Sequence, residues 1–275
     1  MKKYLAVAVL GALSFNSVAS DDDYLRPGKS SVAIKWEHKT LDGRTDRPKV
    51  EFGHRMRNGF KFGVEQVWEY DRSKPETEVG FAPEQYELTF KTDYEFRWGD
   101  NREHQAGPVL DYQTKETSNS VRFGGYYGYK FNSEWQVKFR ARYSQHLDRL
   151  TIKDNPEDSY YRDDKNKEMR YDMWLTYRWS DFRFVYNLIH YSKISSNLNS
   201  NGEEQHVYNN NKQHSWEHEF AVNYRFPYAK KNTIYAKYKV KTEMLKNSHM
   251  YDNNGGYDWY GKRDNAVEIG YKYSW

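Results

Sequence analysis

The segment Val267-Glu268-Ile269-Gly270-Tyr271-Lys272-Tyr273-Ser274-Trp275 decides the fold that this sequence predicts. Large apolar or aromatic side chains occupy every odd position of this segment, and small or charged side chains occupy every even position. Because successive residues of a β-strand point to opposite faces, such a strand has one apolar face and one polar face. The same alternation recurs along the chain, behind an N-terminal segment typical of exported proteins. The combination predicts an all-β fold, an antiparallel transmembrane β-barrel of the outer membrane.

The export signal covers residues 1–20. Lys2 and Lys3 give it a positive start, residues 5–13 form a short apolar core, and residues 17–20 offer small side chains for cleavage. The apolar core is too short to span a bilayer as a helix. No glycine-rich linker or shift in composition divides the rest of the chain. We therefore expect a cleaved signal peptide at 1–20 and a single barrel domain over 21–275.

The composition is polar and aromatic at once. Charged residues make up 30% of the chain and aromatic residues 18%, including 26 Tyr and 9 Trp. A disordered chain of this polarity lacks aromatic residues, and a soluble globule needs more Leu and Ile for its core. A barrel accommodates both features, because lipid contacts one face of each strand, and Tyr and Trp gather at the two membrane interfaces.

Twelve strands account for the alternating segments, and their connections alternate between short and long. The predicted strands lie near residues 31–39, 48–56, 60–70, 85–95, 103–114, 120–130, 135–146, 169–178, 182–191, 214–226, 232–242 and 265–275. Tight turns are predicted at 57–59, 131–134 and 179–181, and long polar loops at 71–84, 147–168, 192–213 and 243–264. Short periplasmic turns and long extracellular loops are typical of outer-membrane barrels. Pro108 lacks an amide hydrogen, so we also expect a bulge in the strand that contains it.

Two strands carry an unbroken row of cations on one face. Lys138, Arg140 and Arg142 alternate with apolar residues in one strand, and Lys237, Lys239 and Lys241 do so in another. A lipid-facing Arg or Lys near the bilayer midplane costs roughly 2–4 kcal/mol, so these rows are expected to face the lumen. The same argument, applied to less regular strands, places further cations on the inner wall: Arg122, Arg170, Arg178, Lys35, Lys49, Arg55, Lys91, Arg183 and Arg225.

A narrow pore lined by such rows favours anions, and the planar fork of Arg matches a carboxylate with two parallel hydrogen bonds. Inward-facing acids could instead neutralise the cations in a purely structural network: Glu51, Glu65, Glu87, Asp93, Asp111, Asp172, Glu217, Glu219 and Glu268. Neither strand with a basic triplet carries an acid among those cations, which favours functional tracks. The structural network stays open as the alternative.

The chain resembles the oligogalacturonate-specific porin family (KdgM/NanC-like). The resemblance rests on the overall strand pattern, on the aromatic strand at 171–179 and the basic strand at 138–143, and on a terminal strand that ends in an aromatic assembly signal with Gly270, Tyr273 and Trp275. It implies a monomeric, narrow outer-membrane channel of a Gram-negative bacterium for acidic sugars, with two facing Arg and Lys tracks. It also implies contact with lipopolysaccharide and with the barrel-assembly machinery. We expect no enzyme activity, no cofactor, no metal site and no nucleic-acid partner.

Two other functions are weighed against the channel. An outer-membrane hydrolase of the phospholipase type would need a nucleophilic Ser beside a His base, and Asn199-Ser200-Asn201-Gly202 lacks that His in its polar loop. A protease would have to pair His146 with Asp148, or His249 with Asp252, above the wall. The third class is a plugged structural or adhesive barrel whose loops do the work.

Overall fold

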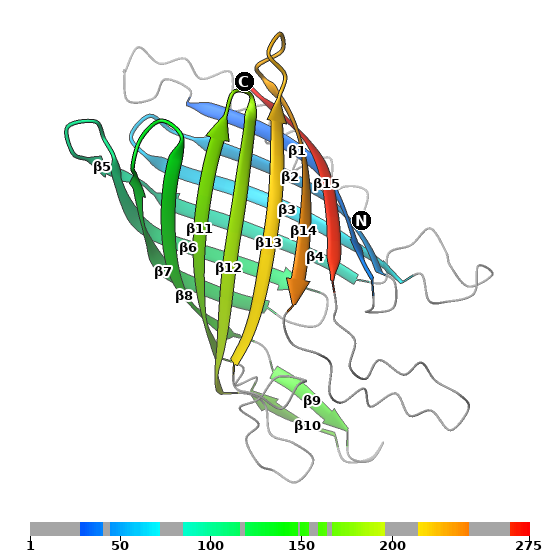
Figure 1. Ribbon diagram of the computed structural model, residues 1–275. Helices are drawn as coiled ribbons and strands as arrows, with labels where there is room; N and C mark the ends of the chain where they lie inside the picture. The colour runs from blue at the N-terminus through cyan, green and yellow to red at the C-terminus, as the bar shows by residue number, and fades with distance from the viewer. Residues whose placement is uncertain are drawn as a thin grey trace, which may run out of the picture.

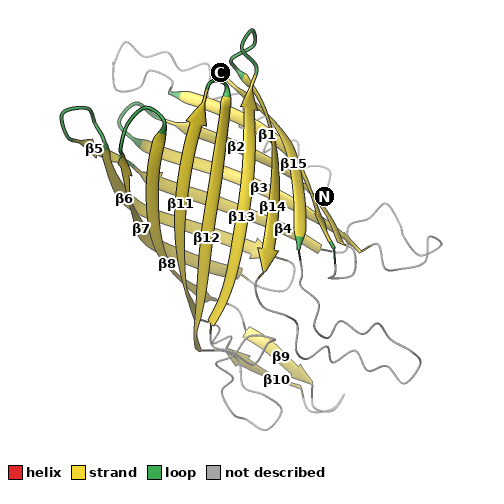
Figure 2. Cartoon of the chain, viewed as in Figure 1, coloured by secondary structure: helices red, strands yellow, loops and turns green. Residues whose placement is uncertain are grey.

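The computed structural model describes residues 28–40, 45–71, 85–115, 119–147, 149–153, 159–163, 167–195, 214–241 and 265–275. These residues form strands and turns only (Figure 2), and none of them belongs to a helix long and apolar enough to cross a membrane. The expected signal peptide at 1–20 and most of the expected long loops lie outside the described residues.

The strands form a barrel that is drawn in Figure 1 with its inner wall partly in view. Its members are β1 (Lys29–Lys39), β2 (Thr45–Arg55), β3 (Phe60–Asp71), β4 (Gln85–Tyr94), β5 (Phe96–Trp98), β6 (His104–Lys115), β7 (Asn119–Lys130), β8 (Trp135–His146), β11 (Lys167–Trp179), β12 (Phe182–Ser195), β13 (His214–Arg225), β14 (Asn232–Lys241) and β15 (Ala266–Ser274). Each pairs antiparallel with its neighbours, and β1 closes the barrel against β15. At that seam the Ser30 and Trp275 backbones exchange hydrogen bonds of 2.9 and 3.0 Å.

The short β5 continues β4 rather than adding a thirteenth strand. Asp93 pairs with Val109 and Phe96 pairs with Ala106, which is the same register on both sides of the break. The break lies opposite Pro108, which has no amide hydrogen to donate. The expected bulge at Pro108 is therefore wrong, since the pairing is interrupted there without a change of register. The barrel has the twelve antiparallel strands that the sequence predicts.

One element was not expected. β9 (Arg149–Lys153) and β10 (Ser159–Asp163) form a separate hairpin inside the segment 147–168, which the sequence predicts to be a loop. Figure 1 shows this hairpin beyond the end of the barrel opposite the C-terminus. β9 alternates between polar and apolar residues over five positions only, and β10 (Ser-Tyr-Tyr-Arg-Asp) does not alternate, so the pair was not recognised.

The described tight turns lie at the end of the barrel that carries the C-terminus (Figure 1). At the first of them Gly59 has a φ of +98°, which a side chain would strain, and the Asn58 carboxamide accepts a hydrogen bond from the Phe60 amide at 3.0 Å. This is the chemistry expected of an Asn-Gly hairpin. Because outer-membrane barrels have their short turns in the periplasm, this end is the periplasmic one.

Burial is inverted relative to a soluble protein. Large apolar side chains are exposed on the outer surface, such as Phe139 at 48% and Ile269 at 58%, whereas charged side chains are buried inside, such as Glu37 at 1% and Asp172 at 2%. Water would penalise this outer surface, but lipid does not. The alternation along each strand thus turns the apolar face to the membrane and the polar face to the lumen.

Candidate functional site: the inner wall of the barrel

All fifteen basic residues that the sequence assigns to the pore lie on strand positions that alternate with the lipid-facing ones and therefore share the inner wall. Cross-strand register sets their neighbours. Lys138 lies opposite Trp174, Arg140 opposite Asp172, and Lys237 opposite Glu268. Each basic triplet thus has an acid-bearing strand directly beside it.

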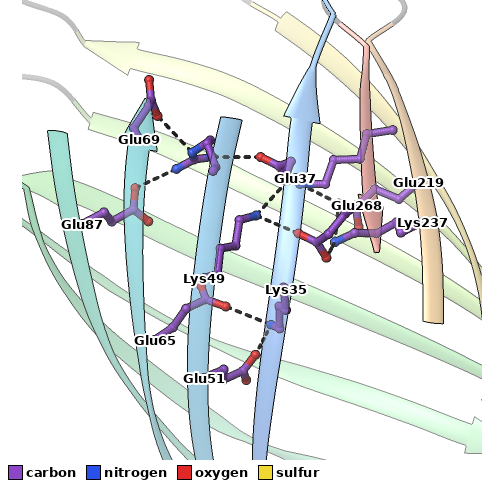
Figure 3. A network of polar contacts seen from close by, with 12 residues as sticks. Lys35, Glu37, Lys49, Glu51, Glu65, Glu69, Glu87, Glu219, Lys237 and Glu268 are labelled. Atoms are coloured by element: carbon purple, nitrogen blue, oxygen red, sulfur yellow. Dashed lines mark hydrogen bonds and ion pairs between the residues drawn. The ribbon is translucent and has the colours of Figure 1, made fainter. Parts of the chain in front are cut away.

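The most buried part of the wall is an ion-pair network centred on Glu37 (Figure 3). Its carboxylate accepts from Lys49 Nζ at 2.8 Å, Lys239 Nζ at 2.5 Å and Arg47 Nη1 at 3.1 Å. Lys49 also donates to Glu268 at 2.7 Å. One carboxylate of β1 therefore holds cations from β2 and β14 together across the closing seam.

The network extends to both sides of Glu37. Arg47 reaches Glu69 at 2.9 Å and Glu87 at 3.3 Å, which ties β2 to β3 and β4. On the other side Lys237 lies 2.9 Å from Glu268 and 3.7 Å from Glu219.

Lys35 and Lys91 form a further part of the same wall nearer the periplasm. Lys35 pairs with Glu51 and lies 3.0 Å from Glu65, and Lys91 lies 3.2 Å from Glu65. These cations also have carboxylates beside them.

A second cluster occupies the opposite wall. Arg142 donates to Asp111 at 2.6 Å, and Asp172 accepts from Arg140 at 3.0 Å and from Arg170 at 2.9 Å. Arg122 donates to Gln113, whose amide also contacts Glu87. The strands of the two basic triplets carry no acid among their cations, but acids of other strands pair with four of them: Arg140, Arg142, Lys237 and Lys239. The middle of the lumen is therefore largely charge-balanced.

Positive charge exceeds negative charge toward the periplasm, where the lumen opens into a cavity of about 1040 Å³. Nine Lys or Arg side chains and four Asp or Glu side chains line this cavity. Two of the nine, Lys35 and Lys237, have carboxylate partners. No carboxylate of the described residues forms an ion pair with the other seven, which are Lys29, Arg178, Arg183, Arg225, Lys230, Lys231 and Lys272.

Arg178 and Arg183 are the clearest case of cations that the protein leaves unneutralised. They lie directly opposite each other on β11 and β12, and both line the cavity. Arg178 donates to the Gln136 carboxamide oxygen at 3.1 Å, and Arg183 donates to that of Asn223 at 3.1 Å. Like charges directly opposite each other in a sheet are destabilising. Neutral amides orient the two guanidinium groups without removing their charge.

The other assigned cations have mixed surroundings. Arg55 lies 2.5 Å from Glu95, and Lys241 at the loop end of β14 has interactions of its own. Lys138 lies over the ring of Tyr126, with Nζ 3.7 Å from the ring centroid. Lys138 thus makes a cation–π contact, and no carboxylate of the described residues forms an ion pair with it.

The residues of the expected assembly signal also shape the wall. Gly270 lies under the ring of Tyr235, and a Cβ at Gly270 would lie 2.4 Å from a ring carbon. The Tyr235 hydroxyl donates to Glu268 at 3.1 Å. Tyr273 and Trp275 stack at the membrane face, with ring centroids 5.7 Å apart. Sequence reasoning missed that Gly270 makes room for a luminal tyrosine.

Of the residues considered for a hydrolase, His146 alone lies within the described residues. Ser200, Asp148, His249 and Asp252 lie outside the described residues. Within the described ranges no group of His, Cys, Asp and Glu side chains could hold a metal ion.

Comparison with known proteins agrees with this architecture. The fold is similar to that of the NanC porin, with a TM-score of 0.63 at 16% identity over 88% of this chain and 98% of that one. A KdgM porin in complex with disordered oligogalacturonate gives a TM-score of 0.55 at 13% identity over 88% and 99%. An outer membrane channel from Pseudomonas putida F1 gives 0.63 at 10% identity over 94% and 100%.

Sequence comparison identifies the family. No curated protein sequence matches the chain significantly. Residues 30–229 match the model of the oligogalacturonate-specific porin protein KdgM. That match spans more than half of the chain and includes ten of its twelve barrel strands, apart from Lys29 of β1. The chain therefore belongs to the KdgM family of oligogalacturonate-specific porins.

Proposed function

We propose that this protein is a passive channel for acidic oligosaccharides, oligogalacturonates or related oligouronates, and that cations of the inner wall guide the carboxylates. As a member of a porin family with a closed antiparallel barrel, the chain is an outer-membrane channel protein rather than an enzyme. The KdgM porin that was crystallised with oligogalacturonate supports this class of substrate. We expect the channel to act as a monomer, in contact with lipopolysaccharide, after insertion by the barrel-assembly machinery.

The observation that carries the proposal is the pair Arg178 and Arg183. Two guanidinium groups face the same cavity with only neutral amide partners. The repulsion between these two guanidinium groups is unfavourable in an empty barrel, and it becomes an attraction to the ligand when a carboxylate lies between them. Arg225 and Lys272 line the same cavity and add to its positive potential. The periplasmic half of the lumen is thus suited to attract and hold anionic sugars.

The cations of the middle lumen would act by exchange of partners. Lys237 lies 3.7 Å from Glu219, which is too long for a strong hydrogen bond, and 2.9 Å from Glu268. A passing uronate carboxylate can replace the loose contact with Glu219 while the pair with Glu268 stays. Lys49, held at 2.7 and 2.8 Å by two carboxylates, and Lys239, held at 2.5 Å by Glu37, are bound too tightly for this exchange. Of the sequence-assigned tracks, we propose that Lys138 and Lys237 serve as steps for carboxylates, whereas Lys49 and Lys239 stabilise the wall.

The test compares two charge-matched double variants in planar lipid bilayers. R178Q/R183Q removes the unneutralised pair, and R57Q/R102Q removes two exposed cations from periplasmic turns outside the cavity. The measurements are the reversal potential under a salt gradient and the blocking of current by trigalacturonate. We expect R178Q/R183Q to lose anion preference and to bind trigalacturonate about tenfold more weakly, since charge-assisted hydrogen bonds are worth about 1.5–3 kcal/mol each. Anion preference and block equal to those of R57Q/R102Q would refute the proposal.

A plugged structural barrel is the second candidate, because ion pairs link most neighbouring strands across the middle lumen. It differs from the channel in one measurable respect. A folded barrel that inserts into the bilayer but passes no current would establish the plug, whereas discrete anion-selective openings would exclude it.

A further inference from the structure

Trp174 of β11 differs from most tryptophans of the barrel, because its side chain belongs to the inner wall. The tryptophans at 36, 135, 179 and 216 are exposed on the membrane side. Trp174 instead alternates with the lipid-facing Met173 and Leu175 and lines the periplasmic cavity. Contact with lipid therefore does not explain why a large aromatic ring is present at this position of the polar lumen.

Two cations from β8 lie over the Trp174 ring. The guanidinium carbon of Arg140 lies 4.7 Å from the ring centroid, and Lys138 Nζ lies 5.6 Å from it. On the other side of β11, Val185 and Asn187 of β12 line the cavity together with the ring. The indole thus contacts two cations of β8 and lines the cavity together with side chains of β12.

Cations that can bind carboxylates lie beside this ring. Lys138 makes no ion pair with a carboxylate of the described residues, and its ammonium group is held between Tyr126 and Trp174. Arg178 lies on the same face of the same strand, four residues further along β11. Arg178 is therefore about 13–14 Å from Trp174 along the strand, whereas Lys138 is beside the ring. An aromatic ring with a cation beside it, and a further cation along the same wall, matches an oligosaccharide whose sugar rings have an apolar surface and a carboxylate.

We infer that Trp174 is a stacking platform for the sugar ring, and that it makes the channel specific for uronate sugars rather than for polyanions in general. One face of a pyranose ring presents C–H groups, which pack on the electron-rich face of an indole. The carboxylate of the stacked residue is then placed beside Lys138. This inference rests on the proposed function, because it names what the same lumen recognises in its substrate.

A purely structural role is the competing explanation. Trp174 could serve only to hold Lys138 and Arg140 in place, so that its loss would weaken the binding of every anion. A stacking platform acts on the ring of the ligand, and its loss weakens only ligands that have a ring. The two roles are separated by a pair of probes with the same charge.

The experiment measures the block of single-channel current by trigalacturonate and by tricarballylate, a tricarboxylate without a ring. Trp174→Ala removes the platform, Trp174→Phe keeps part of it, and Trp36→Ala removes a lipid-facing tryptophan as the matched control. For Trp174→Ala we expect trigalacturonate to bind about fivefold to tenfold more weakly, the size of one lost aromatic contact, and tricarballylate to change by less than about twofold. Trp174→Phe should lie between Trp174→Ala and the wild type, and Trp36→Ala should match the wild type.

The outcomes separate the two proposals. Equal weakening of both probes, or no weakening of either, would refute the platform while the channel for acidic sugars stands. A wild-type channel that trigalacturonate does not block would refute the proposed function and the platform together.

Discussion

Glu37→Gln tests whether the ion-pair network stabilises the barrel. Glu37 is 1% exposed and accepts hydrogen bonds from three cations, Arg47, Lys49 and Lys239. Glutamine has nearly the same shape and removes the charge. The change therefore keeps the side-chain volume but replaces one accepting oxygen by an NH2 group that donates, so it removes both the charge and an acceptor from the three cations.

The expected loss of stability depends on which carboxylate partners each of the three cations retains in Glu37→Gln. Removal of one partner from a buried ion pair costs about 3–5 kcal/mol when the other charge is left alone. In Glu37→Gln none of the three cations loses every carboxylate partner. Lys49 keeps Glu268 at 2.7 Å, and Arg47 keeps Glu69 at 2.9 Å. Lys239 keeps only Glu219, at 3.8 Å. We therefore expect Glu37→Gln to lower the free energy of unfolding by about 2–3 kcal/mol.

Urea unfolding of the refolded barrel in lipid vesicles, followed by tryptophan fluorescence, measures this loss. Glu51→Gln is the matched control, because the Glu51 side chain is 32% exposed and its partner Lys35 keeps Glu65 at 3.0 Å. We expect about 1 kcal/mol or less for this control. The double variant E37Q/K49M also removes a cation and should recover part of the loss.

Two results would show the reasoning to be wrong. One is a Glu37→Gln barrel as stable as the wild type, which would mean that luminal water screens the network. The other is a Glu51→Gln barrel as unstable as Glu37→Gln, which would mean that burial does not govern the cost.

Three further predictions concern assembly, the two faces and ionic screening. Gly270→Leu should lower the yield of the heat-modifiable folded form on gels, because the leucine side chain would overlap the Tyr235 ring. Adding Tyr235→Ala to the same chain should restore the yield, and a yield that stays low would contradict this cause. Phe139→Arg should destabilise the barrel in lipid by about 2–4 kcal/mol, whereas a charge on the luminal face, Gln136→Glu beside Arg178, should cost less than about 1 kcal/mol. Equal costs in urea unfolding would mean that the faces are misassigned. Anion preference, measured from reversal potentials, should fall between 0.1 and 1 M salt, because the Debye length drops from about 10 to 3 Å; a preference that does not change with salt would point to a steric origin.

The local pattern of the chain was enough to locate the barrel strands. In β8 the cations at 138, 140 and 142 alternate with apolar residues, and the structure has the same strand, Trp135–His146, with the same two faces. This prediction succeeds because a period of two is a property of consecutive residues and needs no knowledge of distant ones. In the hairpin β9–β10 only the five residues of β9 alternate and those of β10 do not, which is too short a pattern to predict a strand pair.

The charge state of the lumen was not predictable in the same way. Lys239 and Glu37 are 202 residues apart, and they meet only because β14, β15 and β1 are neighbours at the closing seam. The two basic triplets look unneutralised in the sequence, since their acids lie on other strands. The cations that do lack ion pairs, such as Arg178 and Arg183, come from strands whose sequences are less regular.

The sequence by itself determined the barrel, the number of its strands and the side of the wall on which the assigned cations and acids lie, but it did not single out Glu37 or Arg47. These follow from strand alternation and from the cost of placing a charge in lipid, both of which act residue by residue. Only the tertiary structure decided which cations are paired, where the periplasmic cavity opens and that Trp174 borders it. These depend on cross-strand register and on closure of the barrel, which bring together side chains from distant parts of the chain.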